Sequence, residues 1–127
     1  DVAVRHGKPA VLASVYQYEG QLQVVHPGGA CLRCLWPDAT RDGLVGNCAE
    51  AGVLGPVPGV LGSLQALEVL KLLLDLPGRL GDAVLLLDLN TLATQRLVAR
   101  RSPDCGAGAC ARAAAPTAAA AAHGALE

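Results

Sequence analysis

The segment Cys31-Leu32-Arg33-Cys34-Leu35-Trp36-Pro37-Asp38 places two cysteines two residues apart, just after the chain-breaking run Pro27-Gly28-Gly29. A second pair, Cys105 and Cys110, follows near the end of the domain with a four-residue gap. Both spacings let two thiolates reach one ion, and four thiolates complete a tetrahedral zinc shell. These cysteines therefore predict a structural zinc site, because a shell of four cysteines leaves no open position for a substrate.

Two other interpretations of the cysteines stay open at this point. The four thiols can be buried or reactive without a metal, or they can belong to a disulfide framework, although five cysteines are an odd count for one. The chain opens Asp1-Val2-Ala3-Val4-Arg5 without an apolar leader, which favours metal over disulfides. It also lacks a starting Met, so we expect it to be a piece of a longer protein. His26 is an outside candidate ligand.

Cys48 is the cysteine left over, in the segment Asn47-Cys48-Ala49-Glu50. A polar stretch precedes it and Glu50 follows it, which favours an exposed thiol that is free for chemistry. The alternative is a small buried apolar side chain, since buried free cysteine is common. The residues alone do not separate the two.

Composition limits the classes of function. The 127 residues fit one domain, and 52% are hydrophobic, so a packed core of Leu, Val and Ala is expected. A net charge of −1 excludes bulk attraction to nucleic acid or to an acidic membrane surface. Aromatic residues make up only 2% of the chain, which argues against a platform for stacking bases.

Periodicity and chain breakers predict an α/β chain whose C-terminal portion is mainly β around one long helix. Strands are expected at 10–15 (buried on both faces), 21–25 (half exposed), 83–88 (buried) and 94–100 (more polar). Turns are expected at Gly20 and at Asn90-Thr91, and an exposed loop over 37–47. Helices are expected at 1–7, stopped by Gly7, and from about 58 to 76, stopped by Pro77-Gly78.

The long helix carries one narrow polar stripe in an otherwise apolar surface. Its members are Gln65, Glu68, Lys71 and Asp75. Their ordered spacing argues against a membrane span and predicts two side-chain pairs along the stripe, Glu68–Lys71 and Lys71–Asp75.

Four segments together resemble the ThiF/MoeB/HesA family, bacterial relatives of ubiquitin-activating enzymes. They are, in chain order, Gly7-Lys8-Pro9, the segment 31–38, Asn47-Cys48-Ala49-Glu50-Ala51-Gly52-Val53-Leu54-Gly55, and Gly62-Ser63-Leu64-Gln65-Ala66-Leu67-Glu68. The resemblance covers residues 1 to about 110. The gap between Cys105 and Cys110 departs from the family's usual CxxC.

The resemblance implies the C-terminal half of a Rossmann-like adenylyltransferase fold, with a mixed sheet, one long helix and a zinc site of four cysteines. Residues 1–110 would form this portion, and 111–127 an Ala-rich, disordered tail or linker. Zn2+ would be held by Cys31, Cys34, Cys105 and Cys110. Cys48 would be the catalytic cysteine of the crossover loop. ATP and Mg2+ would bind only to the full-length parent, because the family's nucleotide-binding residues precede this part of the fold.

The function implied is that of an enzyme fragment. The parent would adenylate the C-terminal glycine of a ubiquitin-like sulfur carrier for thiamine or molybdopterin synthesis, as a cytoplasmic homodimer without nucleic-acid or membrane partners. The chain alone would be inactive. Two alternatives remain: a non-catalytic, zinc-stabilised docking module for a ubiquitin-like protein, and an unrelated zinc-ribbon interaction protein.

Overall fold

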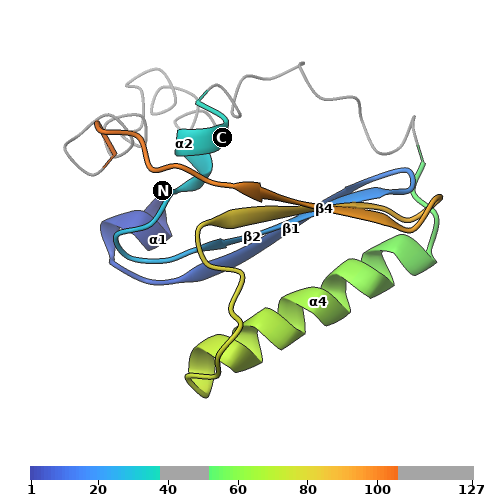
Figure 1. The fold of residues 1–127 in the computed structure, drawn as a ribbon, viewed down its shortest axis with the longest axis horizontal. Helices are drawn as coiled ribbons and strands as arrows, with labels where there is room; N and C mark the ends of the chain where they lie inside the picture. Colours follow the sequence, from blue (N-terminus) through green and yellow to red (C-terminus); the bar gives the residue numbers. More distant parts are fainter. Residues whose placement is uncertain (38–51, 106–127) are drawn as a thin grey trace, which may run out of the picture.

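A four-stranded sheet with one long helix on it forms the body of the protein (Figure 1). The computed structural model describes residues 1–37 and 52–105. Its elements are α1 (Val2–Arg5), β1 (Ala10–Tyr16), β2 (Glu19–Val25), α2 (Leu32–Leu35), α4 (Pro56–Leu73), β3 (Ala83–Asp88) and β4 (Ala93–Val98). Helix α4 lies along one side of the sheet and α2 lies on the other.

All named strands are antiparallel to their neighbours, in the order β1-β2-β3-β4. The predicted mixed sheet is therefore wrong for these strands. Short turns link β1 to β2 and β3 to β4, and such turns join only antiparallel strands. The one parallel pairing among the described residues is an isolated bridge between Gln17 and Val53.

The core between α4 and the sheet is built from aliphatic side chains. Leu61 of α4 is 1% exposed and packs with Leu22, Val24 and Leu87 of the strands. Gly20 lies directly beneath it, inside β2 rather than in the turn that the sequence predicted. A Cβ at Gly20 would come within 2.5 Å of the Leu61 side chain, so glycine is what lets the helix approach this closely.

The burial of the first two strands is the reverse of the prediction. β1 was expected to be buried on both faces, but it is an edge strand with no fully buried residue. β2 was expected to be half exposed, but it lies between β1 and β3 and is mostly buried. The side-chain amide of Gln23 is among its buried groups and has no hydrogen-bond partner within the described part of the chain.

The polar stripe of α4 serves internal contacts. Gln65 donates to the carbonyl of Val11 on β1 at 3.2 Å. Glu68 is buried, accepts a hydrogen bond from the N–H of Leu80 at 2.9 Å and pairs with Lys71. The predicted pairing of Glu68 and Lys71 is confirmed, and these contacts fasten the end of the helix to the segment that leads into β3.

The predicted pairing of Lys71 with Asp75 is wrong. Helix α4 ends at Leu73, and Asp75 follows it with φ of 51°, so it has left the helical face. Its carboxylate instead pairs with Arg79 at 2.6 Å, while Lys71 donates to the carbonyl of Gly78 at 3.0 Å.

The outward face of α4 is apolar. Its exposed side chains include Val60, Leu67, Leu70 and Leu73. The helix therefore carries aliphatic side chains on the core side, where Leu61 lies, and on the outward side as well, unlike an ordinary amphipathic surface helix. Within residues 1–37 and 52–105, no helix is long and apolar enough to cross a bilayer.

Candidate metal centre

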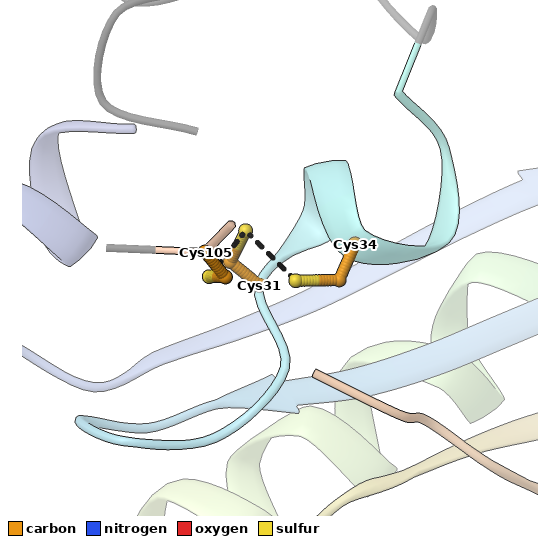
Figure 2. A group of neighbouring side chains, drawn as sticks. All are labelled: Cys31, Cys34 and Cys105. Carbon is orange, nitrogen blue, oxygen red and sulfur yellow. Dashed lines mark hydrogen bonds between the residues drawn. The ribbon is translucent and has the colours of Figure 1, made fainter. Parts of the chain in front are cut away.

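Three cysteine side chains meet at one end of the sheet, although they come from distant parts of the chain. Cys31 caps the start of α2 and Cys34 lies within it, so both belong to one helical turn. Cys105 closes a turn in which its N–H donates to the carbonyl of Ser102 at 2.9 Å. We call the segment that leads into α2 and the turn Ser102–Cys105 the two cysteine arms. Figure 2 shows the three thiols converging from these two arms.

The sulfur atoms lie at separations that suit a metal. Cys31 Sγ is 3.6 Å from Cys34 Sγ and 3.7 Å from Cys105 Sγ. Sulfurs bound tetrahedrally to zinc at about 2.3 Å are about 3.8 Å apart, whereas a disulfide holds two sulfurs at about 2.05 Å. Both the donor set and its spacing therefore fit zinc.

The surroundings favour the thiolate form of Cys34. Burial by itself would raise the pKa of this thiol, but hydrogen bonds from the backbone of Ser102 and Cys31 and from the neighbouring thiols outweigh it, so the pKa lies below its ordinary value. The N–H of Ser102 donates to Cys34 Sγ at 3.4 Å. A metal binds the thiolate, so these contacts prepare the sulfur for coordination. Cys31 and Cys105 are only 3% and 6% exposed.

The structure brings together three of the four cysteines predicted as zinc ligands. Cys110 lies outside the described residues, and so do Cys48 and the predicted loop before it. His26, the outside candidate, is not in the cluster, and its Nε2 lies 3.2 Å from Asp82 Oδ1 instead.

Charged side chains hold the cysteine-bearing segments in place. Asp82, the residue before β3, accepts a hydrogen bond from the N–H of Ala30 at 3.1 Å. Arg33 of α2 donates to both carboxylate oxygens of Asp1, at 2.8 and 2.7 Å. Sequence reasoning missed these residues, because a contact between distant segments leaves no spacing signal.

An open groove lies far from the thiols, on the sheet face opposite α4. Its volume is about 820 Å³. Its lining includes Ser14, Tyr16, Gln21, Asp88 and Gln95, from all four strands or their ends. The groove is open and mixes these polar side chains with aliphatic ones such as Leu86, which suits a protein or peptide surface better than a buried cofactor.

Comparison with known proteins places the chain in a family. A sequence model of the ThiF family matches residues 1–107. The chain belongs to the ThiF family. Relatives include "Sulfur carrier protein adenylyltransferase" of Thermus thermophilus, 43% identical over 111 residues, and "SAMP-activating enzyme E1" of Haloferax volcanii, 41% identical over 105 residues. "Adenylyltransferase and sulfurtransferase MOCS3" of Sus scrofa is 47% identical over 109 residues.

The ThiF-family chain spans well under half the length of these relatives. The matches cover 83%, 83% and 84% of this chain but only 41%, 39% and 24% of the respective relatives. Among solved structures, E. coli MccB with ATP has a similar fold, with a TM-score of 0.64 at 18% identity, over 83% of this chain and 32% of that one. This likeness concerns the fold alone.

Proposed function

We propose that this chain is part of an ATP-dependent adenylyltransferase that activates the C-terminal glycine of a ubiquitin-like sulfur carrier, for thiamine or molybdopterin synthesis. The observation that carries the proposal is the ThiF-family match over residues 1–107. Identities above 40% to relatives named for sulfur-carrier adenylylation and SAMP activation support it.

In this proposal the cysteine cluster is a structural zinc site completed by Cys110. Zinc, when bound, would supply only a rigid tetrahedral crosslink, because four thiolates leave it no open position. The chain's own part is to bring the turn at Ser102–Cys105 against α2, which joins the segment after β2 to the segment after β4. Metal binding then contributes directly to the stability of this end of the sheet.

The chemistry would be divided between this chain and the rest of the enzyme, where ATP and Mg2+ would bind. A carboxylate oxygen of the carrier forms a bond to the α-phosphorus of ATP as pyrophosphate leaves, which gives an acyl adenylate. The Cys48 thiolate would then attack the acyl carbon, so that a thioester forms and AMP leaves. The open groove on the sheet would receive the carrier. The full-length enzyme would be a cytoplasmic homodimer of which residues 1–110 form the C-terminal, Rossmann-like half.

Carrier-dependent exchange of pyrophosphate into ATP tests the proposal. The complete enzyme should exchange only when its carrier is present, and the 127-residue chain alone should stay at background. Failure of the complete enzyme to exchange with any sulfur carrier would contradict the proposed reaction. Robust exchange by the chain alone would contradict the proposed division between two halves.

A zinc-stabilised docking module without catalysis is the second candidate, favoured by the open groove on the sheet at a distance from the thiols. Titration calorimetry with the carrier separates the two. Carrier binding without exchange by the complete protein would support the docking module. Exchange that requires the carrier would support the enzyme.

A further inference from the structure

Arg101 joins the two arms that carry the clustered cysteines. Its Nη1 donates to the carbonyl of Gly28 at 3.0 Å, and its Nη2 donates to the carbonyl of Cys105 at 2.8 Å. Gly28 lies three residues before Cys31, in the turn that leads from β2 into α2. One guanidinium therefore spans both sides of the metal centre.

The two carbonyls that Arg101 binds are close to the ligands themselves. Gly28 has φ of 87° in this turn. The Cys105 carbonyl belongs to a residue whose sulfur lies 3.7 Å from Cys31 Sγ. Fixing both carbonyls fixes where the two arms stand relative to each other, and so the distance between sulfurs of different arms.

The chemistry of the side chain suits this role. A guanidinium is planar and presents its N–H donors in a rigid fork, whereas a lysine ammonium is a single point donor on a flexible stem. Arg101 also brings a positive charge next to thiolates that would carry a net negative charge around zinc. The fork of donors and the positive charge contribute separately to holding the two arms. A substitution by lysine keeps the charge but not the fork.

We infer that Arg101 is a positioning residue for the metal centre: it holds the two cysteine arms at metal-binding separation and so slows the release of zinc. The inference rests on the proposed zinc site. Partners that orient metal ligands from outside the coordination shell typically change metal affinity by about 10- to 100-fold when they are removed. We expect an effect of that size from Arg101, whose two hydrogen bonds to the arms go to backbone carbonyls.

The test compares Arg101→Gln and Arg101→Lys with wild type in the zinc-loaded, full 127-residue chain. Release of zinc to a chromogenic chelator gives the rate, and competition with the chelator gives the affinity. Arg101→Gln should weaken zinc binding by about 10- to 100-fold. Arg101→Lys should recover only a small part of the loss. Arg100→Gln is the matched control and should bind zinc as wild type does, because the exposed Arg100 side chain makes no hydrogen bond among the described residues.

Two further measurements separate positioning from a general loss of stability. Substitution with Co2+ reports the coordination geometry through its visible absorption, which Arg101→Gln should perturb and Arg100→Gln should not. Arg101→Gln should lower the thermal midpoint of the zinc-loaded protein. After treatment with a chelator, the difference in thermal midpoint between Arg101→Gln and wild type should be smaller. If Arg101→Gln lowers the thermal midpoint equally with and without zinc, Arg101 only stabilises the fold.

The outcomes are distinct. Zinc release from Arg101→Gln at the wild-type rate would overturn the inference. Full recovery by Arg101→Lys would also overturn it, because charge rather than the bridging fork would then be sufficient. If Arg101→Gln does not fold, the comparison of Arg101→Lys with wild type decides. A wild-type chain that holds no zinc would instead refute the proposed zinc site.

Discussion

Replacing Gly20 with alanine should destabilise the fold by about 1–3 kcal/mol, the usual cost of forcing extra volume into a packed core. A Cβ at this position would lie 2.5 Å from Leu61 Cδ2, 2.9 Å from Cγ and 3.1 Å from Cδ1. Leu61 has no room to move aside, since it is 1% exposed within the core cluster. Gly20 cannot retreat either, because it is paired with Val15 on one side and Leu87 on the other.

A double-mutant cycle tests whether this contact is the cause. Leu61→Ala alone should cost about 2–5 kcal/mol through the cavity it leaves. In the double variant the clash at Gly20 is gone, so the combined loss should be smaller than the sum by about 1–3 kcal/mol. Chemical denaturation of the zinc-loaded wild type, the two single variants and the double variant, followed by circular dichroism, gives the four free energies of unfolding that the cycle needs.

The chain supplies a matched control for the added methyl group. Gly62 lies in α4, and a Cβ there would have nothing within 4 Å. Gly62→Ala should therefore stabilise the protein by roughly 0.5–1 kcal/mol, because alanine has the higher helix propensity. The reasoning is refuted if Gly20→Ala is as stable as wild type, or if its effect and that of Leu61→Ala are additive.

Further predictions concern the metal, the inward-facing carboxylate and acid stability. Removing zinc with a chelator, or Cys31→Ser, should lower the thermal midpoint more than Cys48→Ser does, because structural metal binding contributes to folding; equal shifts would speak against a zinc site that includes Cys31. Native alkylation with peptide mapping should modify Cys48 of the zinc-loaded chain rapidly, and resistance until unfolding would exclude a chemical role for it. Glu68→Ala should lower the free energy of unfolding by about 1–3 kcal/mol, because it leaves the buried N–H of Leu80 without its acceptor; denaturation midpoints equal to wild type would contradict this. Hydrogen bonds from the Thr91 side chain and the Asn90 backbone lower the pKa of Asp88. The stability that the Asp88 carboxylate contributes is therefore present above the unfolded-state pKa of about 4, and it is lost as pH falls through the folded-state pKa. The gap in thermal midpoint between wild type and Asp88→Asn should therefore close in acid, and a gap independent of pH would show the assignment to be wrong.

Local chemistry made most element boundaries predictable from the sequence. Gly7 ends α1 with φ of 58°, as expected of a glycine after a helix. The predicted end of the long helix, at residue 76 before Pro77-Gly78, is three residues too late: α4 ends at Leu73, and Asp75 already has a positive φ of 51°. The turn at Asn90-Thr91 is confirmed between β3 and β4. These features depend on a few neighbouring residues, so a short window of sequence contains the information.

The partners of each strand were not predictable in the same way. Alternation in β2 indicated a half-exposed strand, but its burial is decided by β1 and β3 on either side, and β3 lies far along the chain. Gly20 was expected in a turn because glycine is common there, yet its role depends on Leu61, a residue of the distant α4. Tertiary contacts of this kind override local preference.

The metal centre shows the same difference between features that a short stretch of sequence predicts and features that depend on distant residues. The spacing of the two cysteine pairs predicted a shared zinc site, with thiols without metal and disulfides as open alternatives, and three of its four members, Cys31, Cys34 and Cys105, do lie together. It did not predict Arg101, whose two bonds go to backbone carbonyls and leave no trace in residue type or spacing at the accepting positions.

Helix α4 shows why a correct periodicity can leave orientation open. The stripe that contains Gln65, Glu68 and Lys71 was evident from spacing, but spacing does not say which way it faces. The structure turns it inward, because a carbonyl of edge strand β1 and the segment around Gly78–Leu80 supply acceptors and a donor that match these side chains. The aliphatic side chains left outside then give α4 two apolar sides. A helix that is apolar nearly all round is typical of a buried one, and only one of its sides is covered by the described residues.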